Sequence, residues 1–393
     1  MAIPIEFVLF SVTLVGVALF HRYTLQVALA GLGVITSYRL AFTEFDLVQH
    51  LGHEWVLLAN LAGLLVGFAL LADHFERSQF TEVLPRFLPD DWKGGFALLV
   101  IVFVLSSFLD NIAGAILGGT MAARLFRGRV HLGFVAAIVA ASNAGGAGSV
   151  VGDTTTTMMW LDGVSALTVL KAYAAAVPVL VVSGLVAARQ QDRHQRIVKD
   201  APEGVRIDWG RVGVVAAILV AAIAANVAMN TRYPAAGELV PGIAIAIWSV
   251  LLFCAPFRKP DWGLVPGAAR GAVFLLALVL CASMMPVEKL PQPSAINTFG
   301  LGFLSAVFDN IPLTALALHQ GGYDWGALAF AVGYGGSMVW FGSSAGVAIS
   351  GRFPEARNAL AWLRDGWHVA AAYVVGYAVM IALLGWQPGA AAP

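Results

Sequence analysis

Two near-copies of one short segment, called here the Asp-Asn phrase, occur in this chain, one in each half. Both copies lie in stretches apolar enough for a lipid bilayer. The copies occupy residues 106–112 and 305–311, and in each an aspartate, Asp110 or Asp309, precedes an asparagine. An aspartate at the centre of a bilayer costs about 3 kcal/mol, so such a residue indicates a functional site by default. Two copies of so costly a residue predict a duplicated transporter whose site lies between the two halves.

The composition indicates a membrane protein. Hydrophobic residues make up 59% of the chain and charged residues 12%, and the mean hydropathy is +0.80, which excludes an ordinary soluble domain. The formal net charge is zero, so nothing indicates nucleic acid as a partner. The two cysteines, Cys254 and Cys281, fall in apolar runs and are expected to pack as small hydrophobic side chains.

Ten apolar stretches are long enough to cross a bilayer as helices, which takes roughly 17–25 residues. The first of them carries Glu6 and lacks a basic leader, so it is expected to be a retained helix and not a signal peptide. The expected crossings are 4–20, 25–43, 55–71, 131–159, 166–188, 211–229, 239–257, 270–286, 325–349 and 367–385.

Two further apolar stretches, 95–126 and 295–320, are each interrupted near the middle by the Asp-Asn pair. A helix running straight through would leave these polar groups in lipid. Two short helices that meet at an Asp-Asn tip would bury the tip in protein instead. The sequence therefore predicts two re-entrant helical hairpins, and Pro312 suits the first turn of the returning helix in the second one.

The basic residues orient this layout in the membrane. Most of the 23 Lys and Arg residues fall on one side, and only Arg39, Lys171, Arg232 and Lys289 remain for the other. By the positive-inside rule the basic side is cytoplasmic. This predicts an integral plasma (inner) membrane protein with both termini outside and a cytoplasmic linker over residues 189–210.

The linker divides the chain into two repeats, 1–188 and 211–393, each with five crossings and one hairpin. Because five is an odd number, the second copy is inverted relative to the first, and the two Asp-Asn tips are expected to meet near the midplane. The predicted fold is an all-α polytopic membrane protein with about ten transmembrane helices plus two re-entrant helical hairpins in two inverted-topology repeats.

A glycine-rich run follows each hairpin, with a Gly-Gly pair, five residues, a third glycine and two hydroxyl or carboxyl side chains. Glycine costs roughly 1 kcal/mol per residue in a helix. Each run is therefore expected to be unwound, with carbonyls available to a cation and with Asp153, Thr154, Ser343 and Ser344 capping the restarted helices. The alternative is close helix packing through small residues. The candidate ion-binding residues of the two runs are Asn143, Gly145, Gly146, Gly152, Asp153, Thr154, Thr155, Gly335, Gly336, Ser337, Gly342, Ser343 and Ser344.

The donor atoms of these residues suit a hard cation such as sodium, which prefers carboxylate, amide and carbonyl oxygens. Neighbouring buried carboxylates also bind protons and titrate as a coupled pair. Proton and cation would then compete for the same oxygens, which is the minimal chemistry of exchange. The alternative is that the tip aspartates only cap helices and have no role in transport. The candidate metal ligands are Asp110, Asn111, Asp153, Asp309 and Asn310.

These residues resemble the ion transporter superfamily, in particular the branch that holds NhaD-type sodium/proton antiporters, arsenical pumps and citrate-transporter-like proteins. The likeness covers residues 95–160 and 295–350 and is carried by segments 143–156, 309–315 and 342–347. It implies a homodimer in which a hairpin-bearing transport domain slides past a scaffold as an elevator. It also implies ion-binding groups at both tips and both breaks.

The leading hypothesis is a secondary active antiporter of sodium or another cation against protons, with Na⁺ and H⁺ as the transported ions, no cofactor and no enzyme activity. The runner-up is a cation-coupled carrier of oxyanions or carboxylates, such as arsenite or citrate. A passive channel and an intramembrane aspartyl protease are further alternatives. Such proteases carry the pattern Gly-x-Gly-Asp. The only Gly-Asp pair near either phrase is Gly152-Asp153, and Val150 occupies the position of the first glycine of the pattern.

Overall fold

The computed structural model describes residues 4–20, 23–83, 87–198, 206–233, 236 and 239–389. Within these ranges every regular element is a helix. Part of the expected linker, residues 199–205, lies outside the described residues.

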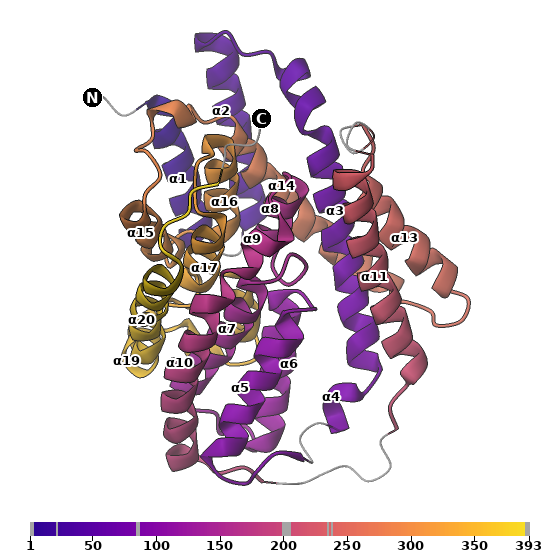
Figure 1. Ribbon diagram of the computed structural model, residues 1–393, viewed down its shortest axis with the longest axis vertical. Coiled ribbons are helices and arrows are strands. Elements are labelled where there is room, and N and C mark those ends of the chain that lie inside the picture. Colours follow the sequence, from indigo (N-terminus) through magenta and orange to yellow (C-terminus); the bar gives the residue numbers. More distant parts are fainter. Residues whose placement is uncertain are drawn as a thin grey trace.

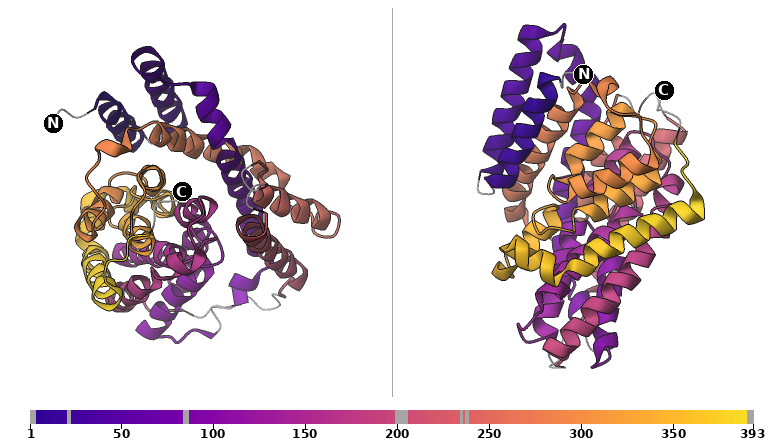
Figure 2. Two further views of the ribbon diagram at one scale, coloured as in Figure 1. Left: turned by 45° about the horizontal axis from the view of Figure 1, so that its top comes forward. Right: turned by 90° about the vertical axis from the view of Figure 1, so that its left-hand side faces the viewer.

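One group of helices forms an arc along one side of the molecule (Figures 1 and 2). Its centre is the long helix α3, which packs against α11, α13 and α14, while α2 joins α1 to α14. We call this group the arc. Its helices are α1 (Ile5–Leu19), α2 (Thr24–Phe42), α3 (Leu47–Arg77), α11 (Trp209–Thr231), α13 (Gly242–Cys254) and α14 (Val265–Ser283).

A second group, which we call the bundle, lies in the hollow of the arc (Figure 2). It contains both Asp-Asn phrases and both glycine-rich runs. Its helices are α5 (Trp92–Ser106), α6 (Asn111–Leu125), α7 (Leu132–Ala147), α8 (Thr154–Leu161), α9 (Ala166–Leu170), α10 (Tyr173–His194), α15 (Ala295–Ser305), α16 (Asn310–Gln320), α17 (Trp325–Gly335), α18 (Ser344–Ser350), α19 (Ala359–Asp365) and α20 (Trp367–Leu384). Short connecting elements are α4 (Phe80–Val83), η2 (Trp262–Leu264), η3 (Val287–Lys289) and η4 (Pro354–Arg357).

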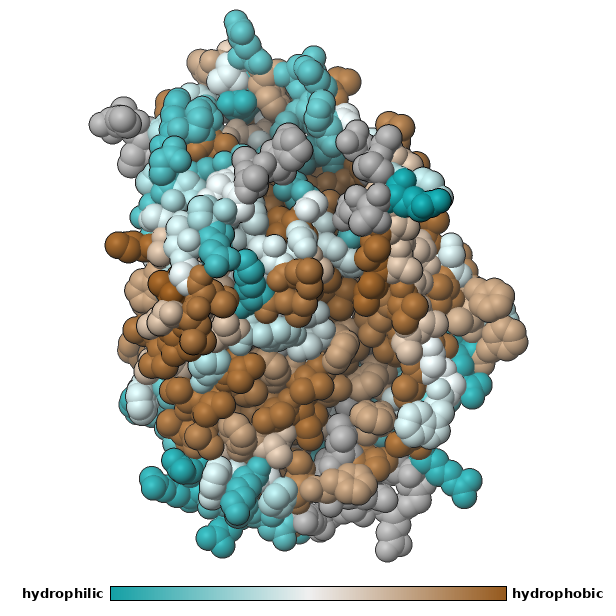
Figure 3. All heavy atoms as spheres, in the orientation of Figure 1, coloured by the Kyte–Doolittle hydropathy of each residue, from teal (hydrophilic) through white to brown (hydrophobic). Residues whose placement is uncertain are grey.

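The surface and the helix lengths together define a multi-pass membrane protein. In the described part of the chain, six helical segments are long and apolar enough to cross a membrane: α2, α3, α9 with α10, α11, η2 with α14, and α20. Apolar side chains form a broad band across the middle of the face in Figure 3, and hydrophilic side chains gather at its two ends. This distribution is what a bilayer requires of the surface that it covers.

Helices occur in all the apolar stretches, but 131–159 and 325–349, each expected as one crossing, are both divided into two helices. The other boundaries lie close to those expected. The largest difference is α3, which begins at Leu47 and not near residue 55, because Asp46 caps it by accepting hydrogen bonds from the backbone amides of Val48 and Gln49. Lys171 and Ala172 separate α9 from α10 within a stretch expected to be one helix. The short helices α4 and α19 were not expected.

Helices α7 and α17 lie at the centre of the bundle. Every residue from Leu132 to Ala147 and from Trp325 to Gly335 is buried. Both helices are rich in alanine and glycine, whose small side chains let neighbouring backbones approach closely. The two helices also pack against each other.

The packing around these central helices is reciprocal between the two halves of the chain. The returning helix of the first Asp-Asn stretch, α6, packs on α18, and its counterpart α16 packs on α8. Each half therefore supplies a helix that supports the glycine-rich run of the other half.

Candidate ion-binding site

The two Asp-Asn phrases form equivalent turns between short helices. Asp110 is the N-cap of α6 with φ −53° and ψ 144°, and Asp309 is the N-cap of α16 with φ −54° and ψ 141°. The Asp309 carboxylate accepts a hydrogen bond from the amide of Ile311 at 3.0 Å. Both stretches thus break at the expected residues, and each aspartate begins the second helix.

The two helix pairs are not equally tight. Gly114 of α6 lies against Ser106 of α5, and Gly118 lies against Val102, so the first pair is antiparallel and closely packed. In the second pair, α15 packs mainly on α17 and α16 mainly on α14 of the arc. The second tip is therefore held by the arc as well as by the bundle.

Each glycine-rich run contains a break between two helices, as the sequence predicts, although not at every glycine. Residues 148–153 separate α7 from α8, and residues 336–343 separate α17 from α18. The restarted helices are capped by Asp153, which accepts from the amide of Thr155 at 3.1 Å, and by Ser343, which accepts from Gly346 at 3.3 Å. Thr154 and Ser344 were expected to cap as well, but each is the first residue inside its helix.

The glycines serve packing more than unwinding. Gly145 and Gly146 lie in the last turn of α7, and Gly335 is the last residue of α17, followed by its C-cap Gly336. A Cβ atom at Gly145 would overlap the carbonyl of Phe103. The alternative of close helix packing therefore holds for Gly145, Gly146 and Gly335, which are helical, whereas Gly336 begins the second break.

Gly152 and Gly342 lie within the breaks. A Cβ atom at Gly152 would overlap the carbonyl oxygen of Ser106, and one at Gly342 would come within 2.5 Å of the carbonyl oxygen of Ala306. In both halves, then, the break rests on the end of the helix that leads into the Asp-Asn tip, and only glycine permits this approach.

A buried chain of amides and hydroxyls joins the two halves. The Asn111 side-chain amide donates to the carboxamide oxygen of Asn143 at 3.1 Å. Asn143 in turn donates to the hydroxyls of Ser337 at 2.9 Å and Ser343 at 3.1 Å. These four side chains are buried. Asn310, also buried, lies outside this chain of bonds, and its backbone carbonyl accepts from the Thr314 hydroxyl at 2.9 Å.

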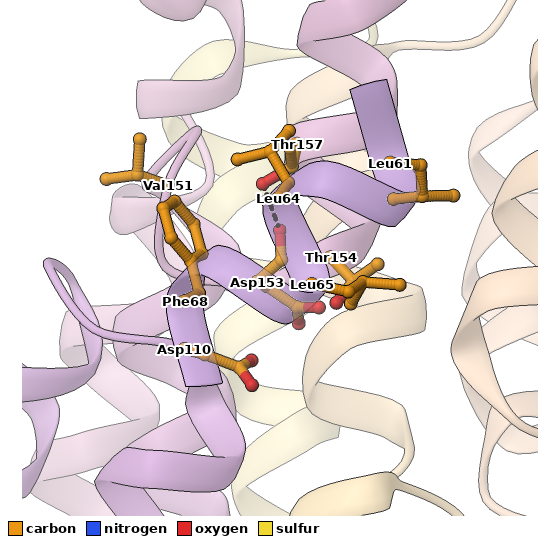
Figure 4. A pocket seen from close by; sticks show the side chains of 9 residues that line it. All are labelled: Leu61, Leu64, Leu65, Phe68, Asp110, Val151, Asp153, Thr154 and Thr157. Atoms are coloured by element: carbon orange, nitrogen blue, oxygen red, sulfur yellow. Dashed lines mark hydrogen bonds between the residues drawn. The ribbon is translucent and has the colours of Figure 1, made fainter. Parts of the chain in front are cut away.

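Asp110 and Asp153 line one pocket, together with Thr154 and Thr157 (Figure 4). Its cavity volume is about 20 Å³, which is room for a single water molecule or small ion. The opposite wall is apolar and comes from helix α3 of the arc, through Leu61, Leu64, Leu65 and Phe68. The pocket therefore lies between the arc and the bundle.

Asp309 and Ser344 line a different pocket, and the Ser344 hydroxyl donates to the Asp309 carboxylate at 3.3 Å. The single pocket expected to hold both tip aspartates is thus replaced by two.

Two carboxylate oxygens of residues that line the first pocket, Asp110 Oδ1 and Asp153 Oδ2, are buried without a hydrogen-bond partner among the described residues. The same is true of Thr155 Oγ1, which lies outside the pocket lining. Asp153 is 2% exposed. Buried polar atoms are nearly always paired, so unpaired oxygens of this kind are typical of positions where a water molecule or an ion binds. In the described residues no three His, Cys, Asp or Glu side chains gather as a metal site. A cation here would rely on hydroxyl, amide or backbone oxygens besides carboxylates.

Some residues around the site were not anticipated. The Ser142 hydroxyl donates to the backbone carbonyl of Asn111 at 2.5 Å, and the Trp362 indole of α19 donates to the carbonyl of Ser337 at 3.2 Å. A serine in an apolar helix gives a weak signal for the first contact. No local pattern signals the second, because Trp362 comes from a distant helix.

Two curated proteins are similar to this polytopic membrane protein. It is 30% identical over 328 residues to sodium/proton antiporter 1 of Arabidopsis thaliana, covering 72% of this chain and 53% of that protein. It is 28% identical over 320 residues to sodium/proton antiporter 2 of the same plant, covering 72% of each. The chain spans about half the length of the first relative. No protein-family model matches the chain.

Proposed function

We propose that this protein is a secondary active antiporter that exchanges sodium, or another monovalent cation, for protons, and that it is not an enzyme. The observation that carries the proposal is the pair of carboxylates, Asp110 and Asp153, in one pocket between the arc and the bundle. The similarity to two proteins named sodium/proton antiporters supports it.

The exchange chemistry follows from competition for the same oxygens. Asp110 Oδ1 and Asp153 Oδ2 are buried and unpaired among the described residues, so in their charged form they need a cation nearby. Sodium bound there offsets the negative charge of the pair, and protons take its place on the carboxylates when sodium leaves. Because either ion satisfies the carboxylates, the carrier moves one inward and the other outward. Asn111, Asn143, Thr154 and Thr155 supply further oxygens.

The contact between arc and bundle suits an elevator motion, in which the bundle carries the site across the membrane. Met158 of α8 and Ile311 of α16 pack into an apolar cluster with α1, α2 and α14. Leu109 and Leu117 pack into a second cluster with α3, α11 and α13. Apolar contacts of this kind are non-directional, so they offer little resistance to sliding.

Further aspects of the assembly belong to the same proposal. The chain is assigned to the NhaD-type branch of the ion transporter superfamily, with inverted repeats 1–188 and 211–393 and a homodimeric assembly. The excess of Lys and Arg on one side places the linker 189–210 in the cytoplasm and both termini outside an inner or plasma membrane. In this proposal both helix pairs, α5 with α6 and α15 with α16, remain re-entrant hairpins, although the first is the more closely packed.

Transport of an oxyanion or a carboxylate is the less favoured function. Two carboxylates in one pocket repel an anionic substrate unless cations bind first. Both curated relatives are named for sodium and protons.

The test is exchange in proteoliposomes that contain a pH-sensitive dye. Addition of sodium to acid-loaded vesicles is expected to relieve dye quenching with the wild-type protein and to have no effect with Asp110→Asn or Asp309→Asn. Asp309→Asn keeps a carbonyl oxygen that can accept from the amide of Ile311, and the Asp110 side chain makes no capping bond to lose, so both variants are expected to fold. Unaltered exchange in Asp110→Asn would defeat the proposed site. Uptake of labelled arsenite or citrate without sodium/proton exchange would favour the alternative function.

A further inference from the structure

The two glycine-rich runs occupy equivalent places in the two halves of the chain. When they are aligned on the Gly-Gly pair and on the third glycine, segment 143–153 corresponds to segment 333–343. The first residues of the two segments are Asn143 and Gly333, the fifth are Ala147 and Ser337, and the last are Asp153 and Ser343. The helices around them correspond as well, because α7 packs on α18 and α17 packs on α8.

The position that Asn143 holds in α7 is held by Gly333 in α17, and each residue faces the break of the other half. The Asn143 side-chain amide donates to the hydroxyls of Ser337 and Ser343. A Cβ atom at Gly333 would lie 3.4 Å from Asp153 Oδ2, the counterpart of the Ser343 hydroxyl. The second break therefore has an amide donor opposite its capping residue, whereas the first break has no side chain at the equivalent position.

The missing donor leaves the Asp153 carboxylate incompletely paired. Its Oδ1 accepts from the amide of Thr155, whereas its Oδ2, on the side of Gly333, is buried without a hydrogen-bond partner among the described residues. The Thr155 hydroxyl, in the same turn of α8, is likewise buried and unpaired within that part of the chain. A buried carboxylate oxygen requires either a hydrogen-bond donor or a positive charge beside it.

We propose that the transported cation binds on the Gly333 side of Asp153, in the position that corresponds to the Asn143 amide of the other half. The amide N–H groups and a cation satisfy the same requirement, because both present positive charge to an oxygen. The absence of a side chain at Gly333 leaves room for the ion, so Gly333 is a positioning residue of the site. This inference rests on the proposed function, since it locates the cation that the function requires.

The two inverted repeats are then unequal in function. The sequence predicts ion-binding groups at both breaks, but the hydroxyls of Ser337 and Ser343 already have the Asn143 amide as their donor. The second break therefore binds no ion, and its polar side chains join the two halves of the bundle. One cation binds at the breaks of each chain.

Gly333→Ser tests the inference by placing a hydroxyl donor beside Asp153. A Cβ atom at Gly333 makes only ordinary contacts, at 3.4 Å from both Ala147 Cβ and Asp153 Oδ2, so the variant is expected to fold. Its hydroxyl donates to Oδ2 and replaces the cation, and we expect sodium affinity to fall by about tenfold or more. The matched control is Gly213→Ser on α11, where an added Cβ atom would meet nothing within 4 Å. It is expected to change sodium affinity by less than about threefold.

Sodium affinity is measured on the purified full-length protein in detergent, from the rise in melting temperature with sodium concentration. Choline chloride keeps the ionic strength constant. The sodium KM of exchange is measured on the same variants in proteoliposomes. If Gly333 served packing alone, Gly333→Ser would lower the melting temperature without sodium and leave the sodium KM unchanged. We expect a melting temperature without sodium no lower than that of the wild type, and a KM raised by about tenfold or more.

A second variant, Gly333→Ala, separates the room for the ion from the donor. Its methyl group reaches the same position but cannot donate to Asp153, so the carboxylate still requires a cation in a smaller space. We expect a sodium affinity between those of the wild type and Gly333→Ser. Wild-type sodium affinity and KM in either folded variant would overturn the inference.

The inference and the proposed function fail in different ways. If the wild-type protein exchanges sodium for protons and Gly333→Ser keeps the wild-type KM, only the position assigned to the cation is wrong. If sodium stabilises the wild-type protein but not Gly333→Ser, and no exchange occurs, the proposed function is wrong and the cation site stands.

Discussion

The side-chain amide of Asn143 donates to the hydroxyl of Ser337 at 2.9 Å, and this bond ties the central helix of the first half to the broken helix of the second. The same amide reaches Ser343, the residue that caps the restarted helix α18. Asn143 of the first half thus fixes the position of the break between α17 and α18 in the second half.

Replacing Asn143 with alanine tests this link. The change leaves the Ser337 and Ser343 hydroxyls and the Asn111 amide without their buried partner, which costs about 1–3 kcal/mol per unsatisfied group. We expect a lower melting temperature in detergent and a loss of exchange by tenfold or more (about 1.4 kcal/mol). Ser142→Ala is the matched control, because its bonds to Ser106 and Asn111 stay within the first half. A wild-type sodium KM in Asn143→Ala would contradict the proposed role.

Asp153 has two separable roles that two substitutions distinguish. Its Oδ1 caps α8 through the amide of Thr155, while its Oδ2 is buried without a partner among the described residues. Asp153→Asn keeps the cap and removes the charge, so we expect wild-type thermal stability with exchange reduced by about tenfold or more. Asp153→Ala also removes the cap and is expected to lose about 1 kcal/mol of stability. Equal melting temperatures for the two variants would argue against the capping role.

Close packing at the breaks predicts the effect of adding one methyl group. A Cβ atom at Gly146 would lie 2.5 Å from the carbonyl oxygen of Gly152, and one at Gly336 would lie 2.6 Å from that of Gly342. Because backbone atoms must move, each alanine variant is expected to lose about 1–3 kcal/mol of unfolding free energy. At Gly213 in α11 the methyl group would meet nothing within 4 Å, so Gly213→Ala is expected to be neutral or to stabilise by up to about 1 kcal/mol. Thermal unfolding in detergent provides the comparison, and a loss at Gly213 equal to that at Gly146 would refute the packing argument.

The elevator proposal predicts that a covalent link between bundle and arc arrests exchange. His319 on α16 and Glu54 on α3 face each other across this interface, with 3.9 Å between Nε2 and Oε1. In a background lacking Cys254 and Cys281, the pair Glu54→Cys and His319→Cys is expected to lose exchange when a short bifunctional thiol reagent joins the two. Reduction of a cleavable reagent restores exchange.

The matched control links two positions within the arc. Arg77 on α3 forms an ion pair with Asp261, the N-cap of η2. Joining cysteines at these two positions is expected to leave exchange unchanged, because they do not move relative to each other. Full exchange by the molecules linked at positions 54 and 319 would rule out sliding at that interface.

The positions of the helices and of their breaks could be predicted from the sequence. Long apolar runs dictate helices in a membrane because each must satisfy its own backbone hydrogen bonds. A charged Asp-Asn pair within such a run marks a break, and Asp110 and Asp309 indeed begin helices α6 and α16. Glycine content located the second breaks less accurately, since Gly145 and Gly146 remain helical and serve close packing.

Only the tertiary structure decided which acidic side chains lie together. Asp110 shares its pocket with Asp153, while Asp309 lines another with Ser344. Which aspartates share a pocket depends on the position of each break relative to the neighbouring helices and on which helix of the arc covers it. These positions are set by side-chain packing between segments that are distant in the sequence. The local hydropathy of the sequence does not predict these positions. The hydrogen bond from the Trp362 indole to the carbonyl of Ser337 could not be predicted for the same reason, because it joins residues that only tertiary packing brings together.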